Sequence, residues 1–597
     1  MYTGVMINIA IPMKPANYLH NSGSSNSSKL FGVSSTSTRA ATARLPLRLR
    51  QRCSLQLSDQ RRSGNYSPSF WNADYMLSLN SDYKDERHMR RAGELIVQVK
   101  MLMEKEADPV VQLELIDDLQ KLSLSHHFEK EINEILFNAS TMYDHKNKER
   151  DLYSTALAFR LLRQHGFQVP QEVFECFKND KGEFKGSLSN DTKGLLQLYE
   201  ASFLLTEGER TLELATEFAT KFLQENEKLN DADDDTHLMS CVRHSLDIPI
   251  HWRIQRPNAS WWIHSYKRRT NMNPFVLELA KLDFNIFQAQ YQQELKQDLR
   301  WWKNTCIAEK LPFARDRLVE SYFWSTGIVQ PRQLEIARIT LAKVIALITT
   351  LDDIYDVYGT LEELELFTKA IKRWDISSID QLPYYMQLCF LTINNFVDDT
   401  AYDVLKEKDI NIIPCLRKSW VDLAEAYLVE AKWFYSGYKP NLEEYLNNAW
   451  ISVSGPAVLC HVFFQVTDSI TRETVESLFK YHDLVRYSST LLRLADDLGT
   501  SLVSRGDVPK SIQCYMNDNN ASEEEARRHV RWLIAETWKE MNVEMVSVDS
   551  PFCKDFIACA ADMGRMAQYM YHNGDGHGMQ NSQIHQQMTD FLFQQWL

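Results

Sequence analysis

Two aspartate clusters contain the residues of this chain that are best suited to chemistry. The first is the sequence DDIYD, whose aspartates Asp352, Asp353 and Asp356 follow the apolar stretch 336–351. On an α-helix, Asp352 and Asp356 lie about 40° apart on one face, whereas Asp353 points about 100° away from Asp352. Burial of such carboxylates is costly unless cations compensate for it. Oxygen ligands at this spacing suit Mg²⁺ or Mn²⁺, although a solvated helix end gives the same short pattern.

The second cluster is the sequence DDLGTSLVSRGD. Asp496 and Thr500 fall one helical turn apart, and the position one turn further along holds Ser504, a far weaker ligand for Mg²⁺ than a carboxylate. Arg493 lies three residues before Asp496, on a neighbouring part of the same face. A cation beside a metal-binding stripe is explained if one anion bridges both, as a diphosphate held by metals and arginines would. Asp507 would lie about 16 Å from Asp496 along a continuous helix, so we do not expect it to substitute.

The composition of the chain favours a helical protein with two large domains. Among 597 residues there are only 20 Gly and 17 Pro, and 44% of the residues are hydrophobic. Apolar residues recur at helical spacing from about residue 75 to 270 and again after the segment 256–274, and no strand-rich stretch is evident. We therefore predict an all-α fold with helical domains over 61–270 and 271–597. We expect a helix break at Ser454-Gly455-Pro456, and no membrane span, because no apolar run reaches about 18 residues.

The first 58 residues differ in composition from the rest of the chain. They contain no Asp or Glu, seven Lys or Arg, and many Ser and Thr. This pattern predicts an organelle transit peptide over residues 1–60, with a generic disordered tail as the alternative. The remaining chain has 59 basic and 79 acidic residues, so we expect no nucleic-acid partner. Ten cysteines without a C-x-x-C pair indicate a reduced, intracellular location.

Together with three further motifs in the same order, the two clusters resemble those of plant terpene synthases, specifically monoterpene synthases of the mint-family type. The tandem-arginine motif is Arg61 and Arg62, followed by Trp71. The other two motifs are the sequence RDR, which contains Arg315 and Arg317, and the C-terminal loop YHNGDGHG. The resemblance covers nearly everything after residue 60. Longer stretches such as RPNASWW and SGPAVLCHVFF are most similar to the limonene-forming members of mint and perilla.

This resemblance implies a largely structural N-terminal α-barrel, whose leading segment closes over the site, and a C-terminal class I terpene synthase α-bundle that holds the active site. The implied substrate is geranyl diphosphate. The implied cofactors are three Mg²⁺ or Mn²⁺ ions, which pull away the diphosphate and leave an allylic cation. The metal-binding residues that the motifs imply are Asp352, Asp353, Asp356, Asp496 and Thr500. The implied substrate-binding residues are Arg315, Asp352, Asp356, Arg493 and Asp496.

The catalytic residues that we expect are Arg61, Arg62, Trp324, Tyr571 and His577. In the family, the tandem arginines matter for isomerising geranyl diphosphate to a linalyl intermediate, which the trans double bond requires before ring closure. Trp324 and Tyr571 are candidates for steadying the cation, with core packing as the alternative for each. Ring closure gives an α-terpinyl cation, and loss of a methyl proton gives limonene. His577 is one candidate for the base, but a lone His in a glycine-rich loop is more often structural, and the released diphosphate is another candidate.

The sequence departs from the family pattern at two places. Relatives usually carry six residues between the motif threonine and RGD, as in T-S-x-E-E-V-S-R-G-D, whereas Thr500 is followed by only four. The simplest interpretation is that two residues are missing, including the metal-binding Glu, which would weaken metal binding and reduce or abolish activity. Limonene-forming relatives also often read KVNALIT where this chain reads KVIALIT. Ile345 lies seven residues before Asp352 on the same helix face, so we expect it to line the pocket and to influence the product.

The leading hypothesis is a monoterpene cyclase of the plastid stroma that forms mainly limonene. Another product of the same cation, such as terpinolene, a pinene or phellandrene, is the alternative within enzymes. A second alternative is a weakly active or non-catalytic homologue that still binds the diphosphate. A sesquiterpene synthase is disfavoured, because the transit-like leader and the tandem arginines favour plastid C10 chemistry. We expect a monomer or a homodimer.

Overall fold

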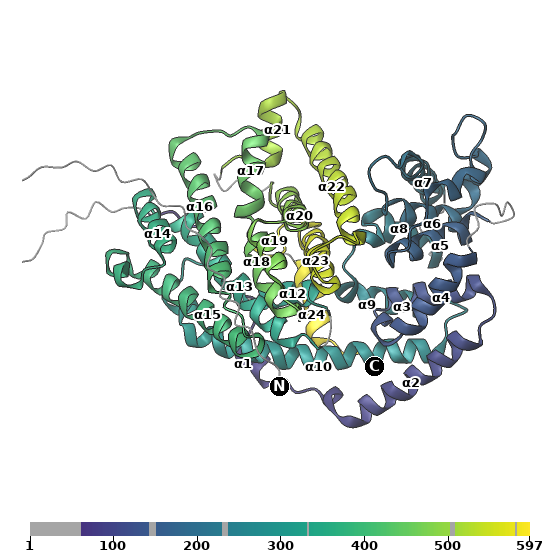
Figure 1. The fold of residues 1–597 in the computed structure, drawn as a ribbon, viewed down its shortest axis with the longest axis horizontal. Coiled ribbons are helices and arrows are strands. Elements are labelled where there is room, and N and C mark those ends of the chain that lie inside the picture. The colour runs from purple at the N-terminus through teal and green to yellow at the C-terminus, as the bar shows by residue number, and fades with distance from the viewer. Residues whose placement is uncertain are drawn as a thin grey trace, which may run out of the picture. The chain divides into compact units, whose positions relative to one another are not determined.

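Helices make up the regular structure of the chain (Figure 1). The computed structural model describes residues 61–142, 151–229, 237–330, 333–501, 508–578 and 582–596. Over these ranges no strand forms, and a single β-bridge joins Lys178 to Phe184. The predicted all-α fold is therefore confirmed. The predicted transit peptide, residues 1–60, lies outside the described residues.

The first half of the chain contains nine α-helices in its described ranges. They are α1 (Ala73–Ser78), α2 (Glu86–Lys105), α3 (Pro109–Lys121), α4 (Glu129–Met142), α5 (Leu152–Gln164), α6 (Thr192–Ser202), α7 (Arg210–Leu229), α8 (His237–Asp247) and α9 (Gln255–Lys267). Short 3₁₀ turns lie at Asp82–Lys84, Ser125–His127, Gln171–Phe177, Gly186–Asn190 and Ile250–Trp252. The apolar spacing that predicted α2 corresponds to one buried face, made of Ala92, Leu95, Val99 and Met103.

The second half begins with the longest helix and continues to the C-terminus. Its α-helices are α10 (Pro274–Thr305), α11 (Ile307–Lys310), α12 (Leu318–Ile328), α13 (Glu335–Asp353), α14 (Leu361–Arg373), α15 (Tyr384–Lys408), α16 (Ile413–Ser436), α17 (Leu442–Ser452), α18 (Gly455–Val466), α19 (Arg472–Phe479), α20 (Asp483–Thr500), α21 (Ser511–Asn519), α22 (Glu523–Val546), α23 (Lys554–Tyr571) and α24 (Ser582–Phe593). A 3₁₀ turn lies at Ile376–Gln381.

The helix that carries the first aspartate cluster is buried on nearly all sides. α13 packs against α10, α12, α15 and α18, which explains why its sequence is apolar all round. The sequence predicted a regular α-helix through Asp356, but the α-helix ends at Asp353 and a π-helical turn follows over Ile354–Tyr358. The amide of Gly359 donates to the carbonyl of Ile354 at 2.8 Å, five residues back, and so closes the wider turn. The expected 40° separation of the two aspartates therefore does not hold.

The predicted helix break lies between α17 and α18. Ser454 has a φ of 73°, in the left-handed region, and Pro456 occupies the first turn of α18. A Cβ on Gly455 would lie 2.7 Å from the Cβ of Ser489, so this glycine permits a close approach to α20. The stretch Leu442–Val466, which spans both helices, is long and apolar enough to cross a membrane by composition, but 78% of its most apolar part is buried inside the protein. The core of a folded protein passes the same test, so this is weak evidence for a span.

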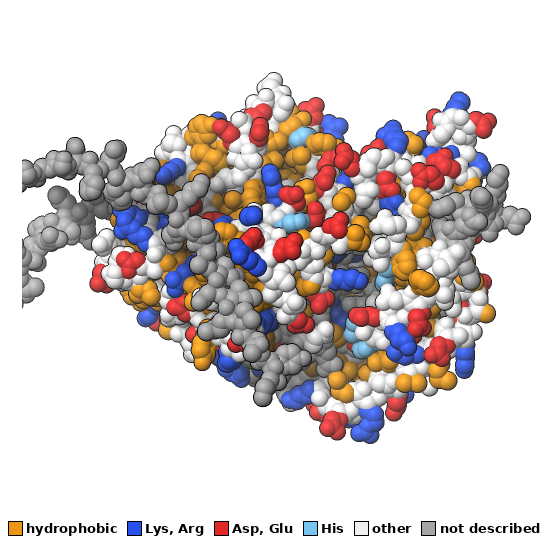
Figure 2. All heavy atoms as spheres, in the orientation of Figure 1, with side chains coloured by type: hydrophobic (Ala, Val, Ile, Leu, Met, Phe, Trp, Pro, Cys, Tyr) orange, Lys and Arg blue, Asp and Glu red, His pale blue; other side chains and the backbone are white. Residues whose placement is uncertain are grey.

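The segment that we expected at the domain junction forms α9, which packs against α3 on one side and against α10, α12 and α24 on the other. Residues from Arg62 onward form one compact unit, and the boundary between residues 270 and 271 stays a prediction. Acidic and basic side chains are interspersed over the face in Figure 2, which shows no continuous basic surface among the described residues.

A buried histidine joins the two halves of the chain. His251 contacts the Oδ1 atom of Asn542 on α22 through its Nε2 atom, at 2.7 Å. The amide nitrogen of Asn542 donates to the backbone carbonyls of Phe203 and Leu205, at 3.0 and 2.9 Å. The Asn542 oxygen must therefore accept, and Nε2 of His251 carries the proton. Burial lowers the pKa of His251 to about 3, so the folded protein holds this side chain neutral.

We predict that His251 makes the stability of the protein sensitive to acid. The unfolded chain takes up a proton at this histidine below about pH 6.5, whereas the folded chain does so only near pH 3. The stabilisation is therefore complete above about pH 6.5 and decreases as the pH falls toward 3. Between about pH 7.5 and pH 5, urea denaturation should show a loss of about 2 kcal/mol from this group. In His251→Gln the loss should be smaller. His264→Gln, which changes an exposed histidine of α9, should behave like the wild type. An unchanged pH dependence in His251→Gln would contradict this account.

Candidate active site

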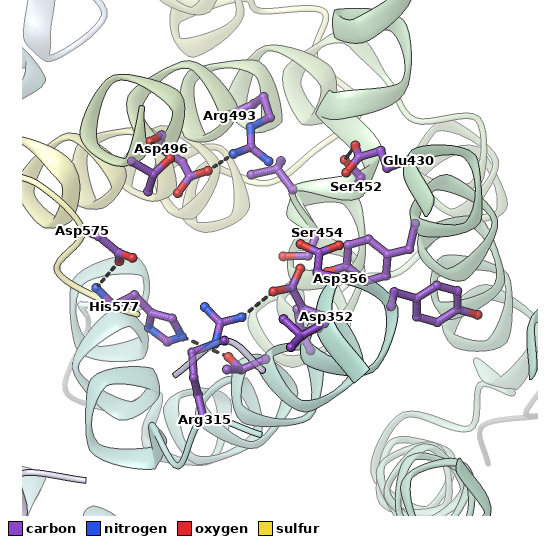
Figure 3. Close-up of a pocket in the computed structure, with 18 of the residues that line it drawn as sticks. Arg315, Asp352, Asp356, Glu430, Ser452, Ser454, Arg493, Asp496, Asp575 and His577 are labelled. Carbon is purple, nitrogen blue, oxygen red and sulfur yellow. Dashed lines mark hydrogen bonds and ion pairs between the residues drawn. The ribbon is translucent and has the colours of Figure 1, made fainter. Parts of the chain in front are cut away.

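A cavity of about 500 Å³ lies among the C-terminal helices. Its wall is formed by residues of α12, α13, α16, α17, α18, α20 and α23, with the leading residues 62–66 and the loop at 575–577. Asp352 and Asp356 stand on one side of it, and Arg493 and Asp496 stand on the opposite side (Figure 3). The structure thus brings the two aspartate clusters of the sequence to one cavity.

In the first cluster, adjacent aspartates have different environments. The side chain of Asp352 is 28% exposed, lines the cavity and forms an ion pair with Nη2 of Arg315. The side chain of Asp353 is fully buried and accepts from the backbone amide of Arg315 at 2.7 Å and from its Nε at 2.9 Å. Burial alone would lower the pKa of Arg315, but the charges of Asp353 and Asp352 raise it well above its usual value. Asp353 therefore holds Arg315 in place, and its predicted role as a metal ligand stays a prediction.

The second cluster repeats this arrangement on α20. Asp496 lines the cavity and forms an ion pair with Arg493, which also lines it. Asp497 is fully buried and lies 2.8 Å from Nη2 of Arg493. It also accepts from the hydroxyl of Tyr445, at 3.0 Å to both oxygens, and from the amide of Ser511 at 3.1 Å. The carboxylate of Asp497 is thus saturated by donors, and it fixes an arginine as Asp353 does.

The remaining part of the second motif is only partly described. Thr500 lines the cavity; its hydroxyl donates to the carbonyl of Asp496 at 2.8 Å and accepts from Nζ of Lys510 at 3.0 Å. The α-helix ends at this threonine. Ser504 and Asp507 lie outside the described residues, so the structure does not place them.

Apolar and aromatic side chains also line the cavity. Trp324 and Tyr571 are among them, with their ring centroids 6.0 Å apart. Ile345 lines the cavity as well, as its place seven residues before Asp352 predicted. The other aliphatic, phenylalanine and methionine side chains that line it are those of Ile328, Ile348, Val357, Ala431, Phe434, Val453, Val458, Leu492, Val508 and Met563.

His577 is held against α13 by a hydrogen bond. The hydroxyl of Thr349 donates to the carbonyl of Ile345 at 2.9 Å, so it accepts from Nε2 of His577, also at 2.9 Å. Nδ1 of His577 is buried and has no hydrogen-bond partner among the described residues. Burial, with a contribution from Arg315, lowers the pKa of His577 to about 4, so the ring is neutral at neutral pH. A neutral ring with a free Nδ1 lone pair is able to accept a proton.

Residues 62–66 of the leading segment line the cavity. Arg62 lines the cavity, donates from Nη1 to the backbone carbonyl of Asp356 at 2.8 Å, and stacks on Phe434 with its Cζ 3.9 Å from the ring centroid. Tyr66 also lines the cavity, and its ring lies 4.9 Å from Cζ of Arg315. Arg61 is half-buried and is not among the lining residues.

Three charged side chains that line the cavity were not predicted from the sequence. Glu430 on α16 accepts from Ser452 and from Asn448, and burial raises its pKa although Ser452 opposes this. The other two are Lys510 and Asp575; Asp575 accepts from the amide of His577 at 3.1 Å. Glu430 and Lys510 lie singly in ordinary polar stretches, so spacing carried no signal. Asp575 lies inside the C-terminal motif YHNGDGHG, so the sequence alone could have identified it.

Known proteins match the chain over both of its halves. Two family models match the chain. The model of the terpene synthase N-terminal domain matches residues 70–246, and the model of the metal-binding domain of the terpene synthase family matches residues 303–540. The chain belongs to the terpene synthase family. The resemblance inferred from five motifs is confirmed, as is the expectation of a helical N-terminal domain followed by a metal-binding one.

Individual relatives of this terpene synthase differ in the reaction for which they are named. The chloroplastic cineole synthase 1 of Salvia fruticosa is 54% identical over 602 residues, which covers 100% of both chains. A limonene synthase solved with 2-fluorolinalyl diphosphate is 67% identical, with a TM-score of 0.88 over 90% of this chain and 100% of that one. Isoprene synthase from grey poplar, solved with three Mg²⁺ ions and dimethylallyl-S-thiolodiphosphate, is 41% identical, with a TM-score of 0.82 over 89% and 99% of the two chains.

The two aspartates of the second cluster should respond differently to the same substitution. Asp497→Asn removes the charge beside buried Arg493, so it should destabilise this terpene synthase by about 3–5 kcal/mol in urea denaturation. Asp496→Asn should change stability by less than about 1 kcal/mol, because Asp496 faces the cavity. It should instead raise the Mg²⁺ concentration at which product formation is half-maximal. Equal stability of the two variants would contradict the division of roles.

Proposed function

We propose that this terpene synthase is a monoterpene cyclase that converts geranyl diphosphate to limonene and diphosphate. The observation that carries the proposal is a cavity of about 500 Å³ with two kinds of lining. Carboxylates and arginines of the two aspartate clusters line it together with apolar and aromatic side chains. A diphosphate suits the charged side chains, and a ten-carbon chain suits the apolar and aromatic ones.

The charged residues that line the cavity fit divalent cations and a diphosphate together. Asp352, Asp356 and Asp496 present oxygen donors to one cavity, and oxygen donors are what Mg²⁺ and Mn²⁺ prefer. Three ions, as in the isoprene synthase structure, are the number we propose for this chain. When bound, they neutralise the diphosphate and so make it a leaving group. Arg315 is anchored to buried Asp353 through its backbone amide and Nε, which leaves its Nη2 to turn from Asp352 to the diphosphate oxygens. Arg493 is the second cation that we propose to bind them.

The leading segment supports the proposed isomerisation. Arg62 is placed over the cavity next to the first aspartate cluster, where a cationic side chain would retain the diphosphate while it moves to the neighbouring allylic carbon. Arg61, the other member of the tandem pair, is proposed to share this role. The outcome is a linalyl diphosphate that rotates freely about its new single bond, which ring closure requires.

The apolar and aromatic lining of the cavity supports the proposed cyclisation. Trp324 and Tyr571 offer aromatic faces to a ring-closed α-terpinyl cation, each worth up to ~2 kcal/mol where water is excluded. The cation becomes limonene when a methyl C–H bond breaks and its electron pair forms the new double bond. The proton goes either to the free Nδ1 of His577 or to the released diphosphate.

One side chain favours a hydrocarbon over an oxygenated product. Cineole, for which the Salvia relative is named, contains an oxygen that must come from water held near the cation. Ile345 presents a sec-butyl group to the cavity and has no polar atom to hold that water. The nearby hydroxyl of Thr349 is engaged with Ile345 and His577. These two residues favour a hydrocarbon product. Limonene, for which the 67% identical relative is named, is our first choice, with terpinolene, a pinene or phellandrene as the other hydrocarbons that the same cation can give.

The product should respond to the polarity of position 345. We expect wild-type protein, incubated with geranyl diphosphate and Mg²⁺ or Mn²⁺, to give limonene as its main product on a chiral gas-chromatography column. Ile345→Asn carries the amide that limonene-forming relatives often have at this position, so it should shift the ratio of limonene to the other hydrocarbon products. Ile345→Leu, which keeps the side chain apolar, is the control. A wild type that forms mainly cineole would overturn the limonene assignment but leave the cyclase assignment intact.

The short second motif favours a second candidate, a weakly active or non-catalytic homologue. Four residues separate Thr500 from Arg505, and none of them is a carboxylate. We expect insertion of Glu-Glu between Leu502 and Val503 to raise product formation at limiting Mg²⁺ by about ten-fold or more, because it returns a charged ligand to the motif. Insertion of Gln-Gln at the same place, which has the same length and no charge, should not. Equal rates for both insertions and the wild type would show that the missing Glu is not limiting.

The leader and the relative's name support a plastid location. Residues 1–60 are proposed to direct the chain to the plastid stroma, since the 54% identical relative is a chloroplastic protein. The proposed partner is geranyl diphosphate alone, with the protein acting as a monomer or a homodimer.

A further inference from the structure

We propose that Glu320 is a positioning residue that fixes the leading segment over the cavity through Trp71. The proposal rests on the proposed function, because it assigns the leading segment a role in isomerising the substrate. Glu320 lies on α12 and does not line the cavity, so it would act through the residues that it holds and through its charge near His577.

The leading segment has no regular structure of its own. Residues 61–69 form no helix or strand, and most of their side chains are half-buried or exposed. Side chains hold it at separate points. Arg62 donates to the carbonyl of Asp356, and Arg317 donates to the carbonyl of Ser67 at 3.0 Å. A segment without a hydrogen-bond ladder is positioned only as well as its anchors allow.

Trp71 is the anchor at the end of this segment. Its indole Nε1 donates to Oε1 of Glu320 at 3.0 Å. Its ring also packs against two rings of α24, with centroid distances of 5.9 Å to His585 and 5.7 Å to Phe593. The neighbouring Phe70 stacks on His585 at 5.2 Å. The anchor thus has one directional hydrogen bond within an aromatic cluster that is less directional.

Glu320 is an unusual residue for a purely packing role. It is 2% exposed, and its second carboxylate oxygen, Oε2, is buried without a hydrogen-bond partner among the described residues. Nε2 of His585 lies 3.5 Å from Oε1. A buried carboxylate costs more free energy than an amide or an apolar side chain of similar size. The hydrogen bond that Glu320 accepts from the Trp71 indole, at the end of the leading segment, explains why a carboxylate occupies this buried position.

The other side of the anchor is rigid because α24 is tied to α10. The amide of Gln288 donates to the carbonyls of Phe591 and Gln594, at 2.9 and 3.0 Å, and the amide of Gln292 donates to the carbonyl of Leu592 at 2.9 Å. These bonds satisfy the last carbonyls of the C-terminal helix with side chains of the longest helix in the described chain. Trp71 is therefore held between two fixed elements, α12 and α24.

The length of chain between the anchor and the arginines is short. Eight residues separate Trp71 from Arg62, and each step along the chain adds no more than about 3.6 Å. Loss of the Trp71 anchor would leave this segment held by Arg62 and Arg317, and so loosen the position of Arg62 beside the first aspartate cluster. Misplacement of a reactive group by about 1 Å can cost up to about a hundred-fold in rate.

The experiment compares two substrates in the full chain. Trp71→Phe keeps a ring and loses the indole N–H, and Glu320→Ala loses the acceptor. Both should lower kcat with geranyl diphosphate by about ten-fold to a hundred-fold. Both should change kcat with linalyl diphosphate by less than about three-fold, because that substrate is already isomerised. Glu320→Gln, which keeps an oxygen acceptor for the indole, should restore most of the rate with geranyl diphosphate. Trp532→Phe, which alters an exposed tryptophan of α22, is the matched control.

Tryptic cleavage after Arg61 and Arg62 tests the anchor without activity. The anchor predicts faster cleavage there in Trp71→Phe and Glu320→Ala than in the wild type, with unchanged cleavage within α12 and α24. Equal losses with both substrates, no loss with either, or faster cleavage throughout α24 would overturn the proposal. A wild type that converts neither substrate would instead refute the proposed function, and the cleavage rates would still decide whether Glu320 anchors the segment.

Discussion

The active-site cavity depends on two buried carboxylates that each hold an arginine at its wall. Asp353 binds the amide and Nε of Arg315, and Asp497 binds Nη2 of Arg493. A guanidinium in so enclosed a site is stable only beside a buried anion, and removal of one partner of such a pair typically costs about 3–5 kcal/mol. The burial of α13 on all sides fixes Asp353 in turn. The packing of the core thus determines where the cationic groups of the site stand.

This arrangement also balances the charge of the cavity before any ligand binds. Asp352, Asp356 and Asp496 face one enclosed space, where like charges repel strongly. Arg315 pairs with Asp352 and Arg493 pairs with Asp496, so each arginine contacts one buried and one cavity carboxylate. Arg315 uses separate groups for its two contacts, the amide and Nε for Asp353 and Nη2 for Asp352, whereas Arg493 contacts both of its aspartates through Nη2.

Sequence reasoning located the residues of the site more accurately than their roles. The motifs led us to expect that Asp352, Asp356, Asp496 and Thr500 belong to one site, and all four line one cavity, although the helical spacing assumed for the first pair does not hold. The division of each aspartate pair into a cavity residue and a buried anchor was not predictable, because it depends on which helix face is covered by neighbours distant in sequence. The π-helical turn after Asp353 was missed for a related reason, since a regular α-helix is the only period that a single sequence supports.

Other parts of the site left no pattern to find. Glu430 approaches the cavity from α16, where a single glutamate in a helix is typical of a solvated surface. The sequence alone was sufficient to predict the helical fold, the helix break at Ser454 and the order of the motifs. Local signals of this kind depend on spacing and on backbone chemistry, whereas the missed features depend on tertiary contacts.

The end of α20 limits what the short second motif can disturb. A Cβ on Gly499 would lie 2.7 Å from the carbonyl oxygen of Tyr571, so α20 and α23 are in close contact one residue before the helix ends. Arg527 of α22 donates to the carbonyl of Leu498 at 3.2 Å and also to the hydroxyl of Ser501. The last turn is therefore held by two other helices, and Lys510 and Ser511, which follow the loop, also contact Thr500 and Asp497. These contacts hold Asp496 and Thr500 in the cavity wall, next to the place where this chain departs from the family pattern.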